Sequence, residues 1–137
     1  MAEFSDYMEN AIINLMRSTS FTGVPAYVAL FTSVATAAEL EAGTLTNEVS
    51  GGAYARQLAG LGVPSDGASS NAADITFPTA TADWGIVTHV ALVDHATNTT
   101  WGTNVNVLMW SPADVEKTIG VDDIYQILAT KLVADVK

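Results

Sequence analysis

Turn-forming residues interrupt this chain at roughly ten-residue intervals beyond residue 20, and this spacing most limits what the chain can fold into. The interruptions include Gly51-Gly52, Pro64 to Gly67, Pro78 and Gly120 to Asp123. Short strands at such spacing are typical of an all-β sandwich or barrel, including the jelly roll. The sequence therefore predicts a mainly β fold, an antiparallel β-sandwich of jelly-roll type.

Runs of branched, aromatic and alternating apolar residues define about eight predicted strands. The longest apolar run covers residues 86–94 and is the most strand-like. A loop rich in Ala and Thr at 33–47 shows a helical tendency at 36–41. The predicted strands are 26–32, 53–58, 74–77, 86–94, 104–110, 115–119, 124–129 and 131–136.

A short amphipathic helix is predicted at residues 4–17, ahead of the strands. Ser5 is a suitable N-cap, and Arg17 is expected in the last turn, where a cation is favourable. Apolar residues recur there at three- and four-residue spacing and form one stripe. The stripe consists of Phe4, Met8, Ala11, Ile12 and Leu15.

The length of 137 residues is typical of one domain. Because Thr22-Gly-Val-Pro25 prevents the helix from continuing, we expect residues 1–20 to form an N-terminal helix or arm. Residues 21–137 are then expected to form a single β-sandwich domain.

Charge and composition exclude several classes of partner. The formal net charge of −10 repels phosphate backbones and anionic membranes, so we expect no nucleic-acid and no membrane partner. Thiol catalysis and thiolate metal sites are excluded because the chain has no cysteine. No apolar run approaches the roughly 18 residues of a membrane span, and no signal peptide is evident.

Candidate catalytic groups are sparse. The two histidines, His89 and His95, are expected to be a hydrogen-bonded strand residue and an exposed loop residue. Adjacent carboxylates such as Asp122-Asp123 point apart in a turn, whereas acid–base hydrolysis needs two that face each other. No phosphate-binding glycine loop or nucleophile elbow is present. We therefore expect no enzyme activity and no catalytic, cofactor-binding or metal-binding residue.

Arg56 is the residue most expected to have a special environment. It shares strand parity with Tyr54, so both side chains should point to one face. An arginine among apolar neighbours in an acidic chain should pair with a carboxylate, for which Glu48, Asp83 and Asp94 are the candidates. The pair would lock the fold or an interface.

The tryptophans allow two interpretations. Trp84 and Trp101 could form a platform on which a sugar stacks, or they could anchor the core and an interface. Trp84 lies between Pro78 and the long apolar run, a position that favours packing.

Several motifs together resemble a family of small bacteriophage virion structural proteins, described as tail-fibre, head-fibre or decoration proteins. They are Ala29-Leu-Phe-Thr-Ser33, Glu48-Val-Ser-Gly-Gly-Ala-Tyr-Ala-Arg-Gln57, Asn71 to Gly85, Val87-Thr-His89 and Asp94. The similarity is most specific through residues 48–94. The chain departs from the family pattern after Asp94, and its loop from Val34 to Leu45 is unusually rich in alanine.

The resemblance implies a β-sandwich subunit located in the virion, with no catalytic residue to carry over. We expect a capsid decoration (cement) or head-fibre protein that binds other virion proteins through its helix and loops. A tail-fibre or baseplate subunit, or a carbohydrate- or receptor-binding module, is the alternative. A homo-oligomer, with a trimer as one form, is also expected.

Overall fold

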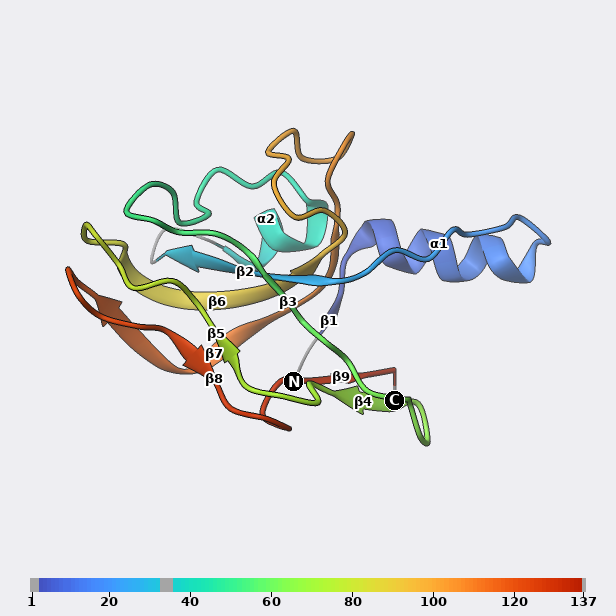
Figure 1. Cartoon of the computed structure of the whole chain (residues 1–137). Coiled ribbons are helices and arrows are strands. Elements are labelled where there is room, and N and C mark those ends of the chain that lie inside the picture. Colours follow the sequence, from blue (N-terminus) through green and yellow to red (C-terminus); the bar gives the residue numbers. More distant parts are fainter. Residues whose placement is uncertain (1–2, 33–35, 137) are drawn as a thin grey trace.

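A five-stranded antiparallel sheet forms the centre of the computed structural model, which describes residues 3–32 and 36–136 (Figure 1). Residues 33–35, at the start of the predicted Ala/Thr loop, lie outside the described residues. The strand order is β1-β7-β6-β2-β3. The strands are β1 (Glu3–Phe4), β2 (Tyr27–Thr32), β3 (Gln57–Leu58), β6 (Gly85–Val93) and β7 (Val107–Ile119).

Two short antiparallel ladders lie on one side of this sheet, opposite the helix α2 (Ala37–Ala42) (Figure 1). In one ladder β4 (Ala68–Ser70) pairs with β9 (Val133–Asp135), and in the other β5 (Ile75–Thr76) pairs with β8 (Gln126–Ile127). The mainly β, antiparallel prediction is confirmed. The jelly-roll sandwich is not confirmed, because two two-stranded ladders lie on that side of the five-stranded sheet.

Strand β2 is buried on both faces, as its continuous apolar run predicts. Val28 and Leu30 face the core cluster that contains Phe77, whereas Ala29 and Phe31 face the cluster that α2 completes. These four residues of β2 are fully buried, because alternate side chains of a strand point to opposite faces and both faces are covered here. The sheet therefore separates two layers of core.

Two predicted strands are one strand in the structure. Segments 104–110 and 115–119 were predicted as separate strands, but β7 continues through residues 111–114 between them. Its pairing with β6 shifts register there, with Val87 opposite Lys117 and His89 opposite Pro112. Such a bulge places extra residues on one strand and accommodates a proline, which has no N–H to donate.

Helix α1 (Asp6–Met16) begins two residues later than predicted and projects from the body of the molecule (Figure 1). Phe4 lies in β1 instead, opposite Met109 of β7, because the edge of β7 offers it backbone partners. Ser5 is the N-cap, as predicted: its Oγ accepts from the Met8 N–H at 3.3 Å and donates to the Val107 carbonyl. Arg17 is the C-cap residue and lies just outside the last turn.

The predicted division into an arm of residues 1–20 and a domain of residues 21–137 stays a prediction. Strand β1 and the Ser5 hydrogen bonds attach the N-terminal end of α1, which we call its base, to β7. The C-terminal end of α1, which we call its tip, has no comparable attachment, since none of the helix residues is buried.

Candidate functional site

Three polar side chains meet in what we call the Arg56 joint, consisting of Glu48, Tyr54 and Arg56. Arg56 Nε and Nη2 donate to the two carboxylate oxygens of Glu48 at 2.6 and 2.7 Å. Both side chains are largely enclosed, with exposed fractions of 3% for Arg56 and 12% for Glu48. Of the three candidate carboxylates, the structure selects Glu48; Asp94 instead accepts hydrogen bonds from Asn106.

Tyr54 connects the joint to the central sheet. Its hydroxyl donates to Glu48 at 2.9 Å and accepts from the Leu30 N–H of β2 at 3.0 Å. Burial, followed by the nearby Glu48 carboxylate, raises the pKa of Tyr54 far above its ordinary value. The phenol is therefore a permanent donor at neutral pH.

Arg56 also holds the loop that follows β6. Its Nη1 donates to the His95 carbonyl at 2.8 Å, and its guanidinium lies 5.0 Å from the ring centre of Trp101. The partly exposed Trp101 ring packs against Phe31, with ring centres 6.1 Å apart. The joint thus fastens three distant segments, and its polar groups are occupied by structural bonds.

The segment that carries the joint is mostly a turn, which corrects the predicted strand 53–58. Only Gln57–Leu58 form strand β3. Gly51, Gly52 and Ala53 all have positive φ, at 71°, 55° and 65°, and the Tyr54 N–H returns to the Gly51 carbonyl. The turn at Gly51-Gly52 agrees with the turn-forming residues in the sequence, but it extends to Ala53, where the sequence predicted the start of the strand.

Trp84 lies in the core and is 5% exposed. Its Nε1 donates to the Gly52 carbonyl at 2.9 Å, and its ring makes edge contacts with Tyr54 and Phe77. Because the ring is enclosed, Trp84 serves packing, and among the two predicted sugar-stacking candidates only Trp101 has an accessible ring.

Both histidines make local bonds. His89 Nδ1 lies 2.8 Å from the Thr88 hydroxyl on β6, and His95 Nδ1 accepts from the Thr97 and Asn98 N–H groups in an exposed turn. These positions match the predicted strand residue and loop residue. The expectation that neither is catalytic stays a prediction.

The half-buried His89 provides a pH-dependent term in stability. Burial lowers its pKa below the ordinary value, although Glu116 opposes the shift. The unfolded chain therefore takes up a proton near pH ~6.5 that the folded chain resists, so this contribution is present at neutral pH and is lost as the pH falls. Urea denaturation between neutral and mildly acidic pH should show that His89→Gln loses less stability than the parent. Equal losses would contradict this assignment.

The predicted apolar stripe of α1 is only partly covered. Met8 and Ile12 are half-buried, whereas Leu15 is exposed. Two further apolar side chains of α1, which the stripe did not include, are also exposed: Ile13 is 52% exposed, close to Leu15 at 51%, and Met16 is 73% exposed. Since residues three apart share a helix face, Ile13 and Met16 form a second apolar surface at the tip of α1.

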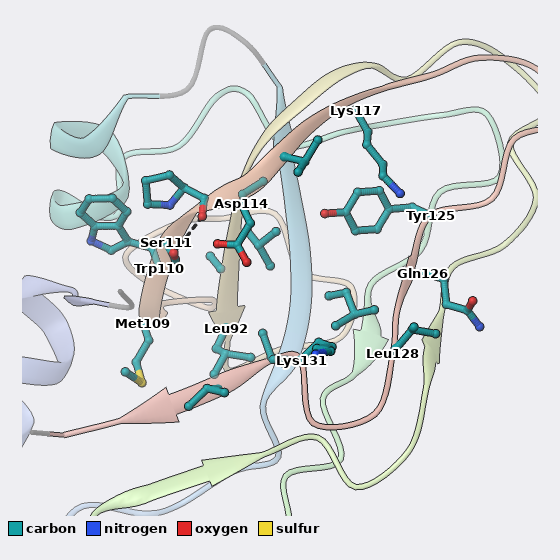
Figure 2. A pocket seen from close by; sticks show the side chains of 18 of the residues that line it. Leu92, Met109, Trp110, Ser111, Asp114, Lys117, Tyr125, Gln126, Leu128 and Lys131 are labelled. Carbon is teal, nitrogen blue, oxygen red and sulfur yellow. Dashed lines mark hydrogen bonds between the residues drawn. The ribbon is translucent and has the colours of Figure 1, made fainter.

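A groove of about 490 Å³ lies between strands β6 and β7 and the C-terminal segment 125–135 (Figure 2). We call it the C-terminal groove. The nearly buried Leu92 and Met109 belong to its lining, together with the more exposed Val115, Leu128 and Val133.

Charged groups of both signs line the C-terminal groove. They are Asp114 and Lys117 on β7 and Lys131 and Asp135 on the C-terminal segment. Figure 2 shows the Tyr125 hydroxyl directed toward the strand that carries Asp114. Burial, followed by the Asp114 carboxylate, raises the pKa of Tyr125, so its hydroxyl stays protonated.

Three carboxylates, two on α1 and one on α2, lie close together where the two helices meet. Oxygens of Asp6, Glu9 and Glu41 all lie within 4.8 Å of one another, near enough to share a cation. Asp6 and Glu9 are exposed, and Glu41 accepts a hydrogen bond from Trp110 Nε1 at 2.9 Å. The absence of a metal site stays a prediction from the sequence.

Comparison with known protein families shows to which family the chain belongs. Residues 3–135 match the family described as podophage GP4 fiber I protein gp80. The chain belongs to this family. No curated protein matches the chain.

Membership of this fibre family confirms the coarse prediction from the motifs. The protein is a structural component of a bacteriophage virion and associates with other virion proteins. Among the described residues, no helix is long and apolar enough to cross a membrane. The assignment of the motifs at residues 48–94 as the family's own pattern stays a prediction, because the family match does not test individual motifs.

Sequence reasoning missed both exposed apolar surfaces. The Ile13–Met16 pair was visible as a second three-residue spacing within the helix. The C-terminal groove had no such signal, because its walls are separated by a turn and come together only when β8 pairs with β5 and β9 with β4.

Proposed function

We propose that the protein is a non-enzymatic fibre-type subunit of the phage head, as a head fibre or a capsid decoration protein, and that α1 is its assembly element. The observation that carries this proposal is the exposed apolar surface of Ile13 and Met16 on a helix that projects from the body (Figure 1). The membership in a phage fibre family supports a role in assembly.

The length of α1 supports an intermolecular contact. Isolated helices shorter than about 12–15 residues are marginal in water, and α1 has 11 residues with none buried. A Tyr7–Phe21 ring contact, with centres 6.4 Å apart, supports its base. A partner that covers the tip would stabilise the rest of the helix.

The absence of catalysis is part of the same proposal. The enclosed charged groups Arg56 and Glu48 bond to each other, to Tyr54 and to a backbone carbonyl. His89 and His95 make bonds to neighbouring residues. These contacts support structural roles for the side chains that would be the first candidates for chemistry.

The double substitution Ile13→Gln/Met16→Gln tests the role of α1. Glutamine favours helices and adds no charge, so the variant removes apolar surface alone. Loss of two side chains that the partner would bury should cost about 2 kcal/mol or more of binding. The dissociation constant then rises at least tenfold, and the number of subunits per particle should fall. Quantitative immunoblots of purified phage measure that number, and thermal denaturation should be unchanged.

Val63→Gln is the matched control, because Val63 is an apolar residue, 95% exposed, that lies in a loop. It should leave particle incorporation unchanged. Normal incorporation of the α1 variant would refute the proposed role of α1. A thiol label on Val63→Cys, in a chain without cysteine, should locate the subunit at the head in electron micrographs. Label at the tail would support the predicted tail-fibre alternative instead.

A further inference from the structure

Two exposed apolar surfaces of the same chain lie apart from each other. The tip of α1 projects to one side of the body, whereas β8 and β9 lie beneath the central sheet (Figure 1). The segment that contains β8 and β9 lines the C-terminal groove together with β6 and β7. We propose that α1 of one subunit packs into the C-terminal groove of a second copy of this chain. This inference rests on the proposed role of α1 as the assembly element.

The apolar content of the two surfaces is similar. Ile13 and Met16 are 52% and 73% exposed on the helix, and Val115, Leu128 and Val133 are 67%, 53% and 50% exposed at the groove. Such side chains gain free energy when a contact removes them from water. An unbranched methionine adapts to an irregular surface, which suits Met16 at the tip.

The balance of charges in the C-terminal groove allows a second copy of this acidic chain to bind there. The chain has a net charge of −10, so most pairs of surfaces on two copies repel each other. The groove carries two acidic side chains, Asp114 and Asp135, and two basic ones, Lys117 and Lys131, so their formal charges cancel. The excess negative charge of the chain therefore lies outside the groove.

The end of α1 that would enter the groove has complementary charge. Its C-terminal end is the negative end of the helix dipole, which the side chains of Lys117 and Lys131 can stabilise. Arg17, the C-cap residue, can pair with Asp114 or Asp135. The acidic residues of α1, Asp6 and Glu9, lie at its base, away from this end.

Such a contact is head-to-tail, because each copy contributes a helix on one side and a groove on the other. Contacts of this kind generate a closed ring or an open filament, depending on the rotation between neighbours. Either product suits a fibre-type subunit. A symmetric pairing of two α1 helices would instead stop at a dimer.

Sedimentation of the purified full chain tests the contact. The parent should form assemblies that grow with concentration. Ile13→Gln/Met16→Gln and Val115→Gln/Leu128→Gln should each weaken self-association at least tenfold, while Val63→Gln behaves as the parent. An equimolar mixture of the two double variants should form heterodimers and nothing larger, because one intact helix and one intact groove remain. Val133→Gln replaces the groove variant if that variant fails to fold.

The inference is wrong if the parent stays monomeric at every concentration. It is also wrong if the helix variant abolishes association and the groove variants do not, or if the mixture forms no heterodimer. The proposed function is judged separately by particle incorporation. A monomeric parent combined with loss of the α1 variant from particles would overturn the groove contact and leave the proposed function standing.

Discussion

Replacing Arg56 with alanine is expected to lower the free energy of unfolding by about 3–5 kcal/mol, because it leaves the Glu48 carboxylate enclosed without its counter-ion. The substitution also removes the hydrogen bond to the His95 carbonyl and the contact with the Trp101 ring. Three segments of the chain lose their common partner at once. Urea denaturation followed by tryptophan fluorescence measures the change.

Arg17→Ala is the control, since Arg17 is exposed and its side chain bonds only locally to Asn14. It should change stability by no more than about 0.5 kcal/mol. Arg56→Lys should recover only part of the loss, because lysine keeps the charge but cannot form the two-pronged bond to Glu48. A loss below about 1 kcal/mol for Arg56→Ala would show that the joint is not a principal support of the fold.

Gly52→Ala is expected to cost about 3 kcal/mol, from steric crowding combined with an unfavourable backbone conformation. A Cβ on Gly52 would lie 2.8 Å from Trp84 Nε1 and 3.1 Å from the Ala82 carbonyl oxygen. The side chain of Trp84 cannot move away without losing its bond to the Gly52 carbonyl and its contacts in the aromatic cluster. Thermal and urea denaturation report the loss.

Gly51→Ala separates the two causes. Gly51 also has a positive φ of 71°, but a Cβ there would meet no atom within 4 Å. It should therefore cost only the backbone term, about 1 kcal/mol. Equal losses at the two glycines would mean that the close approach of Trp84 contributes nothing.

The Arg56 joint and Trp84 lie in the most distinctive motifs of the sequence, yet they do not form the surfaces that we propose for assembly. Both are enclosed and bonded within the chain. The exposed apolar groups that we propose for assembly lie on α1 and at the C-terminal groove. The residues that carry the predicted resemblance are bonded within the fold, and the surfaces that we propose for assembly lie on other segments.

Local features were predicted well where one physical cause dominates. The Ser5 cap, the helix at Ala37–Ala42 and strands β2 and β6 each follow from a capping residue or an apolar run that acts over adjacent residues. Prediction failed over 53–56, where the predicted Gly51-Gly52 turn extends to Ala53 and the strand begins only at Gln57, and at Pro112, where the pairing with β6 accommodates the proline through a bulge. In both places contacts with residues distant in sequence fix the local conformation: Tyr54 and Arg56 bond to Leu30 and His95, and Pro112 lies opposite His89.

Composition and short-range spacing were enough to predict the mainly β class, the amphipathic helix, the acidic net charge and the need of Arg56 for a carboxylate. The packing of distant segments was needed to show that Glu48 is that carboxylate, that Trp84 packs over Gly52, and that Ile13 and Met16 remain exposed. It also brought β7 and the C-terminal segment together as a groove. These outcomes depend on which distant segments pack together, and contacts between distant segments leave no local pattern in the sequence.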